Sequence, residues 1–387
     1  MTGDLARTTE ILRDLIGFPT ISKDSNLALI DYASDLLGGL GTEITLSRDA
    51  TGAKANLFAT IGPDVDGGIV LSGHSDVVPV AGQDWSGNPF GMVERDGALY
   101  GRGACDMKGF IACVLALAPR FANASLTRPI HIALTYDEET GCLGAPVLLE
   151  ALAASGRKPA ICIIGEPTEM RIIEGHKGCY EYTTRFEGLE GHGSAPDCGV
   201  NAVEYAARYI GELIATGEAL KSRAPEGSRF DPPHTTVSVG RIEGGIAHNV
   251  IPNTCAVDWE FRPVNASDAA YVRDRMHRHT QTALLPGMRA VHPQAAVTTE
   301  VIGEVDGLEP LPHSEAVDLV TELTGGNARD LVAFGTEAGL FQQHGISTVV
   351  CGPGSIAQAH KPDEFVTLDQ LTQCLAMLDR LIPKLSD

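Results

Sequence analysis

Residues 68–76 read GIVLSGHSD, an apolar run that stops at Gly73 and is followed at once by His74 and Asp76. A short apolar run closed by a turn residue is typical of a buried β-strand. Three further runs of this form end beside turn-forming or polar residues, and they cover residues 130–136, 160–165 and 347–352. The pattern predicts buried strands with chemically capable side chains at or just beyond their carboxyl ends.

Helical patterns separate these strands, at residues 108–123, 143–155, 313–324 and 367–384. Alternating strands and helices predict an α/β fold whose open sheet is mixed but mostly parallel, with helices on both faces. In such sheets, ligands gather outside the carboxyl ends of the strands.

The middle of the chain has a different pattern. Strands are expected at 178–187, 235–243, 254–262 and 296–304, and helices at 200–220 and 267–285. This β-α-β-β-α-β order predicts a small α+β domain inserted into a larger one. We therefore expect a catalytic domain formed by residues 1–177 and 305–387, and an inserted domain formed by residues 178–304.

The amino-acid composition limits the classes of molecule that the chain is expected to bind. Lysine and arginine number 29 against 50 aspartates and glutamates, a net charge of −21 that disfavours binding to nucleic acid or to an anionic membrane. No run approaches the ~20 apolar residues of a membrane span, and charged residues interrupt the apolar ones near the N-terminus, unlike a secretion signal. Nine cysteines with no CxxC pair indicate a reducing cytoplasm.

Two histidines and three carboxylates form a candidate metal-ligand set: His74, Asp106, Glu139, Glu166 and His360. Most of them lie at or just beyond the carboxyl ends of predicted strands. Histidine and carboxylate ligands suit zinc, and also cobalt or manganese. If Asp106 bridges, the five ligands can hold two ions, each bound by one histidine, one glutamate and the shared aspartate.

Neighbouring carboxylates suggest supporting roles. Asp76 lies on the same side of an extended segment as His74, so its carboxylate could fix the tautomer of that ring. Asp137, Glu138 and Glu139 end a buried strand, where a cation explains three like charges better than water does. A two-metal site fits hydrolysis, with Glu138 as the proton carrier.

Each residue alone has a simpler explanation. Asp106 could be the N-cap of helix 108–123, and a lone His74, Glu166 or His360 could have a structural role. The glycine-rich loop 101–109 could resemble a phosphate cradle, but it lacks the GxxxxGK[ST] spacing.

Six stretches taken together are far more specific: SGHSD (72–76), YGRGACDMKG (100–109), DEE (137–139), GEPT (165–168), GHGSAP (191–196), and GPGS continuing through HKPDE (352–364). They resemble the co-catalytic zinc amidohydrolases, a family that includes acetylornithine deacetylases, succinyl-diaminopimelate desuccinylases, aminoacylases and glutamate carboxypeptidases. The resemblance runs from about residue 10 to the C-terminus.

The resemblance implies a role for each metal-site position. His74 and Glu166 would hold one divalent ion, Glu139 and His360 would hold the other, and Asp106 would bridge them. Zinc is the expected metal, with cobalt as the alternative. Asp76 would orient His74, and Glu138 would act as general base and then as the acid that protonates the leaving amine.

The inserted domain gains a role by the same resemblance. His192 would reach into the active site of the partner subunit and help to stabilise the tetrahedral oxyanion. This placement implies a homodimer formed through the inserted domain, which would also act as a lid. Capping of a turn is the alternative role for His192.

Four stretches look most like the acetylornithine deacetylase branch: 175–178, 199–202, 335–342 and 352–364. That branch implies release of acetate from N2-acetyl-L-ornithine, a step of arginine synthesis. Arg262 could grip the substrate α-carboxylate as a bidentate fork, and Asn249 could add a hydrogen bond, since both resemble substrate-contacting positions of the family. Charge alone suggests that Glu337 meets the ornithine ammonium, and a surface or helix-capping role is the alternative.

Other functions stay open at this point. An acetylcitrulline deacetylase, a desuccinylase or a dipeptidase would use the same centre with another substrate. A non-catalytic binding module would be expected to lack a ligand or Glu138, and this chain has them all.

Overall fold

The computed structural model describes residues 3–386, which divide into two compact units. The described part of unit 1 comprises residues 3–175, 310–331 and 336–386. Unit 2 comprises His176–Glu309 and the short segment Val332–Gly335. The sequence pattern had no feature that distinguished this short segment from the residues around it.

Unit 1 is built on an eight-stranded sheet with the order β1-β2-β6-β3-β7-β16-β8-β15. The strands in that order are β1 (Glu43–Arg48), β2 (Ala55–Ile61), β6 (Ile130–Thr135), β3 (Ile69–His74), β7 (Ile161–Pro167), β16 (Ser347–Gly352), β8 (Ile172–His176) and β15 (Arg329–Val332). The four central strands, from β6 to β16, run parallel, whereas β2 and β8 pair antiparallel with them. The predicted mixed, mostly parallel sheet is confirmed.

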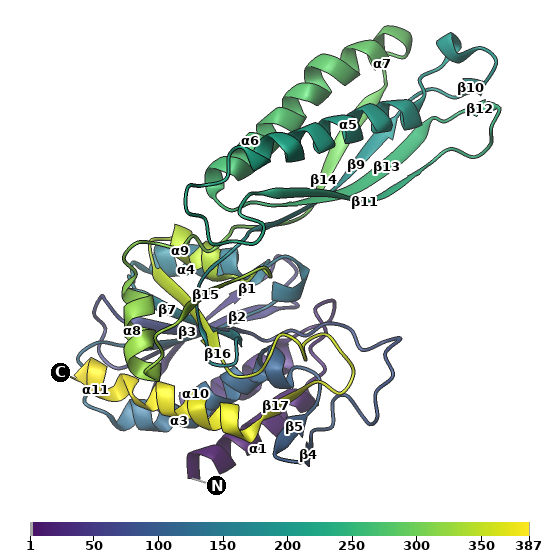
Figure 1. Cartoon of the computed structure of the whole chain (residues 1–387). Coiled ribbons are helices and arrows are strands. Elements are labelled where there is room, and N and C mark those ends of the chain that lie inside the picture. Colours follow the sequence, from purple (N-terminus) through teal and green to yellow (C-terminus); the bar gives the residue numbers. More distant parts are fainter. Residues whose placement is uncertain (1–2, 387) are drawn as a thin grey trace. The chain divides into compact units, whose positions relative to one another are not determined.

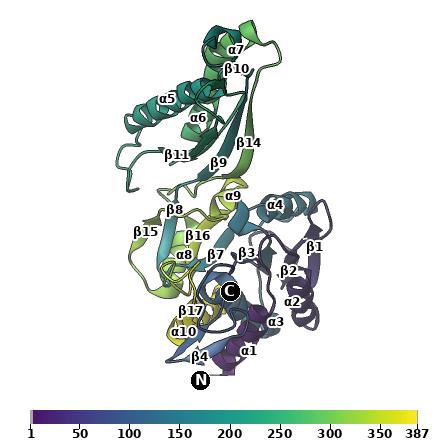
Figure 2. The same cartoon turned by 90° about the vertical axis from the view of Figure 1, so that its right-hand side faces the viewer.

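Helices cover both faces of this sheet (Figure 1). On one face, α3 (Gly109–Asn123) packs on the central strands beside α1 (Gly3–Gly17), α2 (Leu27–Gly38), α8 (Glu315–Thr324) and α10 (Leu368–Asp379). On the other face lie α4 (Gly144–Ser155) and α9 (Ala338–Gln343), seen at another angle in Figure 2. A small sheet adds β17 (Phe365–Thr367), β5 (Ala98–Tyr100) and β4 (Val93–Arg95), and α11 (Leu381–Ser386) follows α10.

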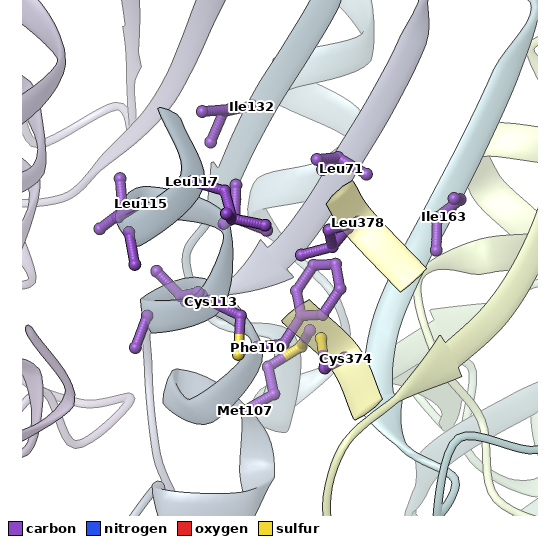
Figure 3. Packing of buried hydrophobic residues seen from close by; sticks show 14 of the residues in the cluster. Leu71, Met107, Phe110, Cys113, Leu115, Leu117, Ile132, Ile163, Cys374 and Leu378 are labelled. Carbon is purple, nitrogen blue, oxygen red and sulfur yellow. The ribbon is translucent and has the colours of Figure 1, made fainter. Parts of the chain in front are cut away.

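The core of unit 1 lies between α3 and the sheet. Phe110 of α3 packs there with Leu71 of β3 and Leu378 of α10 (Figure 3). The Phe110 ring lies so close to β7 that a Cβ atom on Gly165 would stand 2.0 Å from it. Only glycine fits at position 165, and the next residue along the strand is the candidate ligand Glu166.

Unit 2 contains a four-stranded antiparallel sheet with the order β11-β13-β9-β14. The strands are β9 (Cys179–Glu187), β11 (Thr236–Gly244), β13 (Thr254–Arg262) and β14 (Ala296–Val305), and a separate short pair is formed by β10 (Gly191–His192) and β12 (Val250–Ile251). The helices α5 (Ala202–Lys221) and α6 (Ala266–His279) pack on one face of the sheet, and η4 (Thr280–Leu284) and α7 (Leu285–Val291) continue α6. Alternating residues of β13 are buried against these helices, among them Trp259 and Phe261.

Within residues 3–386, no helix combines the length and apolar character needed to cross a membrane. All nine cysteines are free thiols.

One buried histidine in the sheet makes stability depend on pH. His131 of β6 stacks on Phe58, and its Nδ1 atom lies 3.1 Å from the Thr60 hydroxyl. Burial, helped by the charge of Arg157, lowers its pKa to about 4. A histidine in the unfolded chain titrates near pH 6.5, so as the pH falls the unfolded state takes up this proton first.

We expect this residue to cost the folded state up to about 3 kcal/mol as the pH falls from about 6.5 to about 4. The His131→Asn variant keeps a partner for Thr60 but does not titrate, so its free energy of unfolding should fall less over this window. Urea unfolding at several pH values measures the difference, with His313→Asn as the exposed control. If the free energy of unfolding of His131→Asn fell as steeply with pH as that of the control, the low pKa of His131 would be contradicted.

Candidate metal centre

The candidate ligands come from five segments of unit 1. His74 ends β3, Glu166 lies near the end of β7, Glu138 and Glu139 form the turn η2 (Glu138–Thr140) after β6, Asp106 lies in η1 (Ala104–Lys108) before α3, and His360 lies in the loop between β16 and β17. Because β3, β6 and β7 are parallel neighbours, their carboxyl ends meet at one edge of the sheet. The two loops bring Asp106 and His360 to the same edge.

Asp106 stands between the two histidines. Its Oδ1 atom lies 3.0 Å from His74 Nε2, and its Oδ2 atom lies 3.2 Å from His360 Nε2. On the outer sides, Glu166 Oε1 lies 3.8 Å from His74 Nε2 and Glu139 Oε2 lies 3.0 Å from His360 Nε2. Each carboxylate oxygen of Asp106 therefore faces a different histidine–glutamate pair, which is the arrangement of a bridging ligand.

The ligand cluster carries an excess of negative charge. Burial, and then the charge of Asp106, raises the pKa of Glu166 well above its usual range and also raises that of Glu139. Burial raises the pKa of Asp106, but hydrogen bonds with His360 and His74 outweigh this effect and hold the pKa below its usual range. Two imidazoles do not balance four clustered carboxylates, so the cluster favours a bound cation.

The donor set fits divalent metal ions. Ligand atoms of His74, Asp106 and Glu139 lie within 4.8 Å of one another, and so do those of His74, Glu138 and Glu166. Imidazole nitrogen and carboxylate oxygen are the donors that zinc and its first-row neighbours accept. The structure thus brings together all five ligands predicted from the sequence, and it places Glu138 beside them. The alternative role of Asp106 as a helix cap is wrong, since Lys108 precedes α3 and no side chain caps that helix.

The His74 ring is oriented by Asp76, but mainly through the main chain. His74 Nδ1 lies 2.9 Å from the Asp76 carbonyl oxygen and 3.6 Å from its Oδ1 atom. A carbonyl oxygen only accepts, so Nδ1 carries a proton, and Nε2 is the ring nitrogen that faces Asp106. The Asp76 carboxylate instead accepts the main-chain N–H groups of Glu138 and Glu139, at 3.1 and 3.3 Å, and the Ser22 hydroxyl at 2.6 Å.

The third carboxylate of the acidic run has a different partner. Lys54 Nζ lies 2.6 Å from both oxygens of Asp137, and it also donates to the Ser22 carbonyl. Asp137 itself adopts a left-handed backbone conformation, with φ of 54°. Asp137 thus anchors the turn that carries Glu138 and Glu139, whose side chains point to the ligand cluster.

Five supporting side chains were not predicted from the sequence. Ser22 and Lys54 lie in segments with no motif, so no local signal marks them. Cys142 follows the acidic run, and its thiol lies 3.6 Å from Glu138 Oε1. Arg102 and Glu364 also form a buried ion pair beside the site. Both lie inside the quoted motifs, and Arg102, a charged residue among small ones, was a usable signal.

Three predicted residues belong to unit 2. His192 is exposed on β10, and its Nδ1 atom lies 2.7 Å from the Ser194 hydroxyl. Asn249 is exposed, and its carbonyl accepts the Gly193 N–H. Arg262 is half-buried, and its guanidinium forks onto the Glu260 carboxylate at 3.1 and 3.3 Å.

Glu337 lies inside unit 1. Its carboxylate accepts the Ser72 hydroxyl at 2.6 Å and the Thr135 hydroxyl at 2.8 Å, and the residue is 1% exposed. Both oxygens are thus engaged by the strands β3 and β6. This arrangement favours a positioning role over the expected contact with a substrate ammonium.

Comparison with known proteins decides the family. The model of "Peptidase family M20/M25/M40" matches residues 70–384. The chain belongs to this family. An acetylornithine deacetylase of Myxococcus xanthus is 36% identical over 99% of this chain and 98% of its own length, and one of Shigella sonnei is 35% identical over 95% and 94%. An M20 family metallo-carboxypeptidase of Sulfolobus solfataricus has the same fold, with a TM-score of 0.74, 19% identity and coverage of 100% and 99%.

The resemblance to the amidohydrolase family is thereby confirmed. As an M20 protein with acetylornithine deacetylases among its full-length relatives, the chain is a metallo-amidohydrolase. The binding-module alternative, which required a lost ligand or a lost Glu138, has no support in the assembled cluster.

Proposed function

We propose that this M20 enzyme removes the acetyl group of N2-acetyl-L-ornithine and releases L-ornithine and acetate. Two observations support the proposal: the near full-length likeness to acetylornithine deacetylases, and the position of Asp106 between two histidine–glutamate pairs. The nine free thiols suit a reducing cytoplasm, where we place the enzyme.

Two divalent ions, zinc first and cobalt as the alternative, would be held in this cluster. His74 and Glu166 would bind one ion, His360 and Glu139 the other, and Asp106 both. When bound, the ions supply Lewis acidity that polarises the acyl carbonyl and lowers the pKa of water.

Glu138 is the proton carrier of the proposed reaction. Burial raises the pKa of Glu138 well above its usual range. The charge of His74 opposes this shift, and the neighbouring Glu139 and Asp106 add to it. A raised pKa makes the Glu138 carboxylate a stronger base, which can take a proton from the attacking water and return it to the amine nitrogen as the C–N bond breaks. The Cys142 thiol near Oε1 helps to hold the carboxyl in place.

Contacts with the substrate would come from unit 2. Arg262 would grip the α-carboxylate by exchanging its intramolecular partner Glu260 for the substrate, and Asn249 would add a hydrogen bond. His192 would stabilise the oxyanion of the tetrahedral intermediate in a partner subunit. Because its Nδ1 atom is engaged by Ser194, its Nε2 atom is the one left to act there.

Two substitutions separate metal binding from turnover. We expect Asp106→Ala to weaken metal binding by about 100-fold or more, since both ions lose a ligand. Glu138→Ala should retain both ions but lose turnover by orders of magnitude. Metal analysis after dialysis and steady-state kinetics measure these effects, with the exposed Asp84→Ala as control. A Glu138→Ala variant near the wild-type rate would refute the proton-carrier role.

A substrate panel tests the specificity. We expect kcat/KM on N-acetyl-ornithine to exceed that on acetyl-citrulline, succinyl-diaminopimelate and a dipeptide by at least about 10-fold. The assay uses zinc-loaded and cobalt-loaded enzyme in parallel. A higher kcat/KM on any of the other three substrates would reassign the enzyme to that activity.

The homodimer would form through the edge of unit 2. Among the described residues, β11 pairs only with β13, so its outer edge is free to pair with β11 of a second copy. Exposed apolar side chains surround this edge: Ile214 is 61% exposed, Ile242 48% and Ile246 86%.

We expect Ile214→Asp with Ile242→Asp to convert a dimer into a monomer in light scattering after gel filtration. Activity should fall with it, because His192 would lose the partner site. Val65→Asp, an equally exposed position in unit 1, is the control. A monomeric wild-type enzyme with full activity would rule out this assembly.

A further inference from the structure

Two of the five candidate ligands stand on loops. His74 and Glu166 belong to strands, so the hydrogen-bond ladder of the sheet fixes their main chain, and the Asp76 carboxylate accepts the main-chain N–H of Glu139. Asp106 lies in η1 and His360 in the loop before β17, and the His360 side chain is 52% exposed. Something other than the sheet must hold Asp106 Oδ2 at 3.2 Å from His360 Nε2.

Glu364 holds the main chain around Asp106. Its Oε1 atom accepts the N–H groups of Cys105 and Asp106 at 3.0 and 3.2 Å. The Glu364 side chain is 1% exposed, and it follows His360 by only four residues. One carboxylate thus ties the segment of the bridging ligand to the end of the His360 loop.

Arg102 connects that carboxylate to the other side of the loop. Its Nη1 atom donates to Glu364 Oε2 at 2.6 Å and to the Lys361 carbonyl at 3.4 Å. Its Nη2 atom donates to Gln83 Oε1 at 2.5 Å, and Gln83 Nε2 in turn donates to the His360 carbonyl at 2.8 Å. The guanidinium lies over the Trp85 ring, 5.0 Å from its centroid, and the Arg102 side chain is 1% exposed.

We infer that Arg102 and Glu364 are positioning residues that set the spacing of Asp106 and His360, and so the affinity of the ion those two ligands share. The inference rests on the proposed two-metal centre. Arg102 and Glu364 do not bind the ion. They hold the main chain of the residues that do.

The chemistry of the pair supports a positioning role. A buried ion pair gives little net stability, because removing two charges from water costs about as much as their attraction returns. A planar guanidinium, in contrast, fixes several acceptors in one geometry, which a lysine or an apolar side chain cannot do. Here, the acceptors are Glu364, Gln83 and the Lys361 carbonyl, and each connects to a ligand segment.

Calorimetric titration of the metal-free protein with Zn²⁺ alone tests the inference. We expect wild type to bind two ions, and Arg102→Met to bind at least one of them about 10–100-fold more weakly. Arg102→Lys should lie between them, because one ammonium cannot reach three acceptors. Arg223→Met is the control, since the exposed Arg223 pairs at 3.0 Å with the buried Asp268 in unit 2. It should change stability and leave both zinc affinities unaltered.

The outcomes distinguish a failure of the positioning role from a failure of the proposed metal centre. Weaker zinc binding by Arg102→Met but not by Arg223→Met supports the positioning role. Wild-type affinity for both ions in a folded Arg102→Met protein overturns it, and if that variant does not fold, wild-type affinity in Arg102→Lys does so. A wild-type protein that binds fewer than two ions overturns the proposed metal centre itself, and this role with it.

Discussion

Repulsion among buried carboxylates is the constraint on which the rest of this molecule depends. Asp106, Glu138, Glu139 and Glu166 are held in one cluster with two histidines, and burial raises the pKa of three of these carboxyls. Such a cluster persists only if the surrounding fold is rigid enough to hold like charges together. The parallel strands β3, β6 and β7 provide that rigidity, because their ladder fixes three carboxyl ends side by side.

Sequence patterns located the elements that are regular and buried. The run at 347–352 coincides with β16 because it is continuously apolar, and the strand expected at 254–262 coincides with β13 because its residues alternate strictly. The helix expected at 367–384 is instead two helices, α10 and α11, which Arg380 separates. The buried strand β2 was not predicted at all, since Asn56 and Thr60 interrupt its apolar run, and partners elsewhere in the fold satisfy them.

The site was predictable to the extent that it lies at strand ends. His74, Glu139 and Glu166 follow from that rule, and the two loop ligands followed from residue type and family resemblance. What the sequence could not supply was the pairing of groups that are distant along the chain. Lys54 neutralises Asp137, 83 positions away, and Glu337 meets Ser72 across 265 positions. The sequence prediction that Glu337 contacts the substrate rested on charge alone. No local pattern reveals that two hydroxyls already donate hydrogen bonds to its carboxylate.

The centre is therefore built in two ways. The main chain of its strand-borne ligands, His74 and Glu166, is fixed by backbone hydrogen bonds of the sheet. Its loop-borne half has no such ladder, so Asp106 and His360 depend on side chains that reach main-chain atoms: Glu364 for the first, and Gln83 with Arg102 for the second. Apolar packing could bury these loops but could not set the direction of a carboxylate or an imidazole to within the tolerance of metal coordination. The buried charges beside this site are thus explained by the precision the ligands need, not by the stability of the fold.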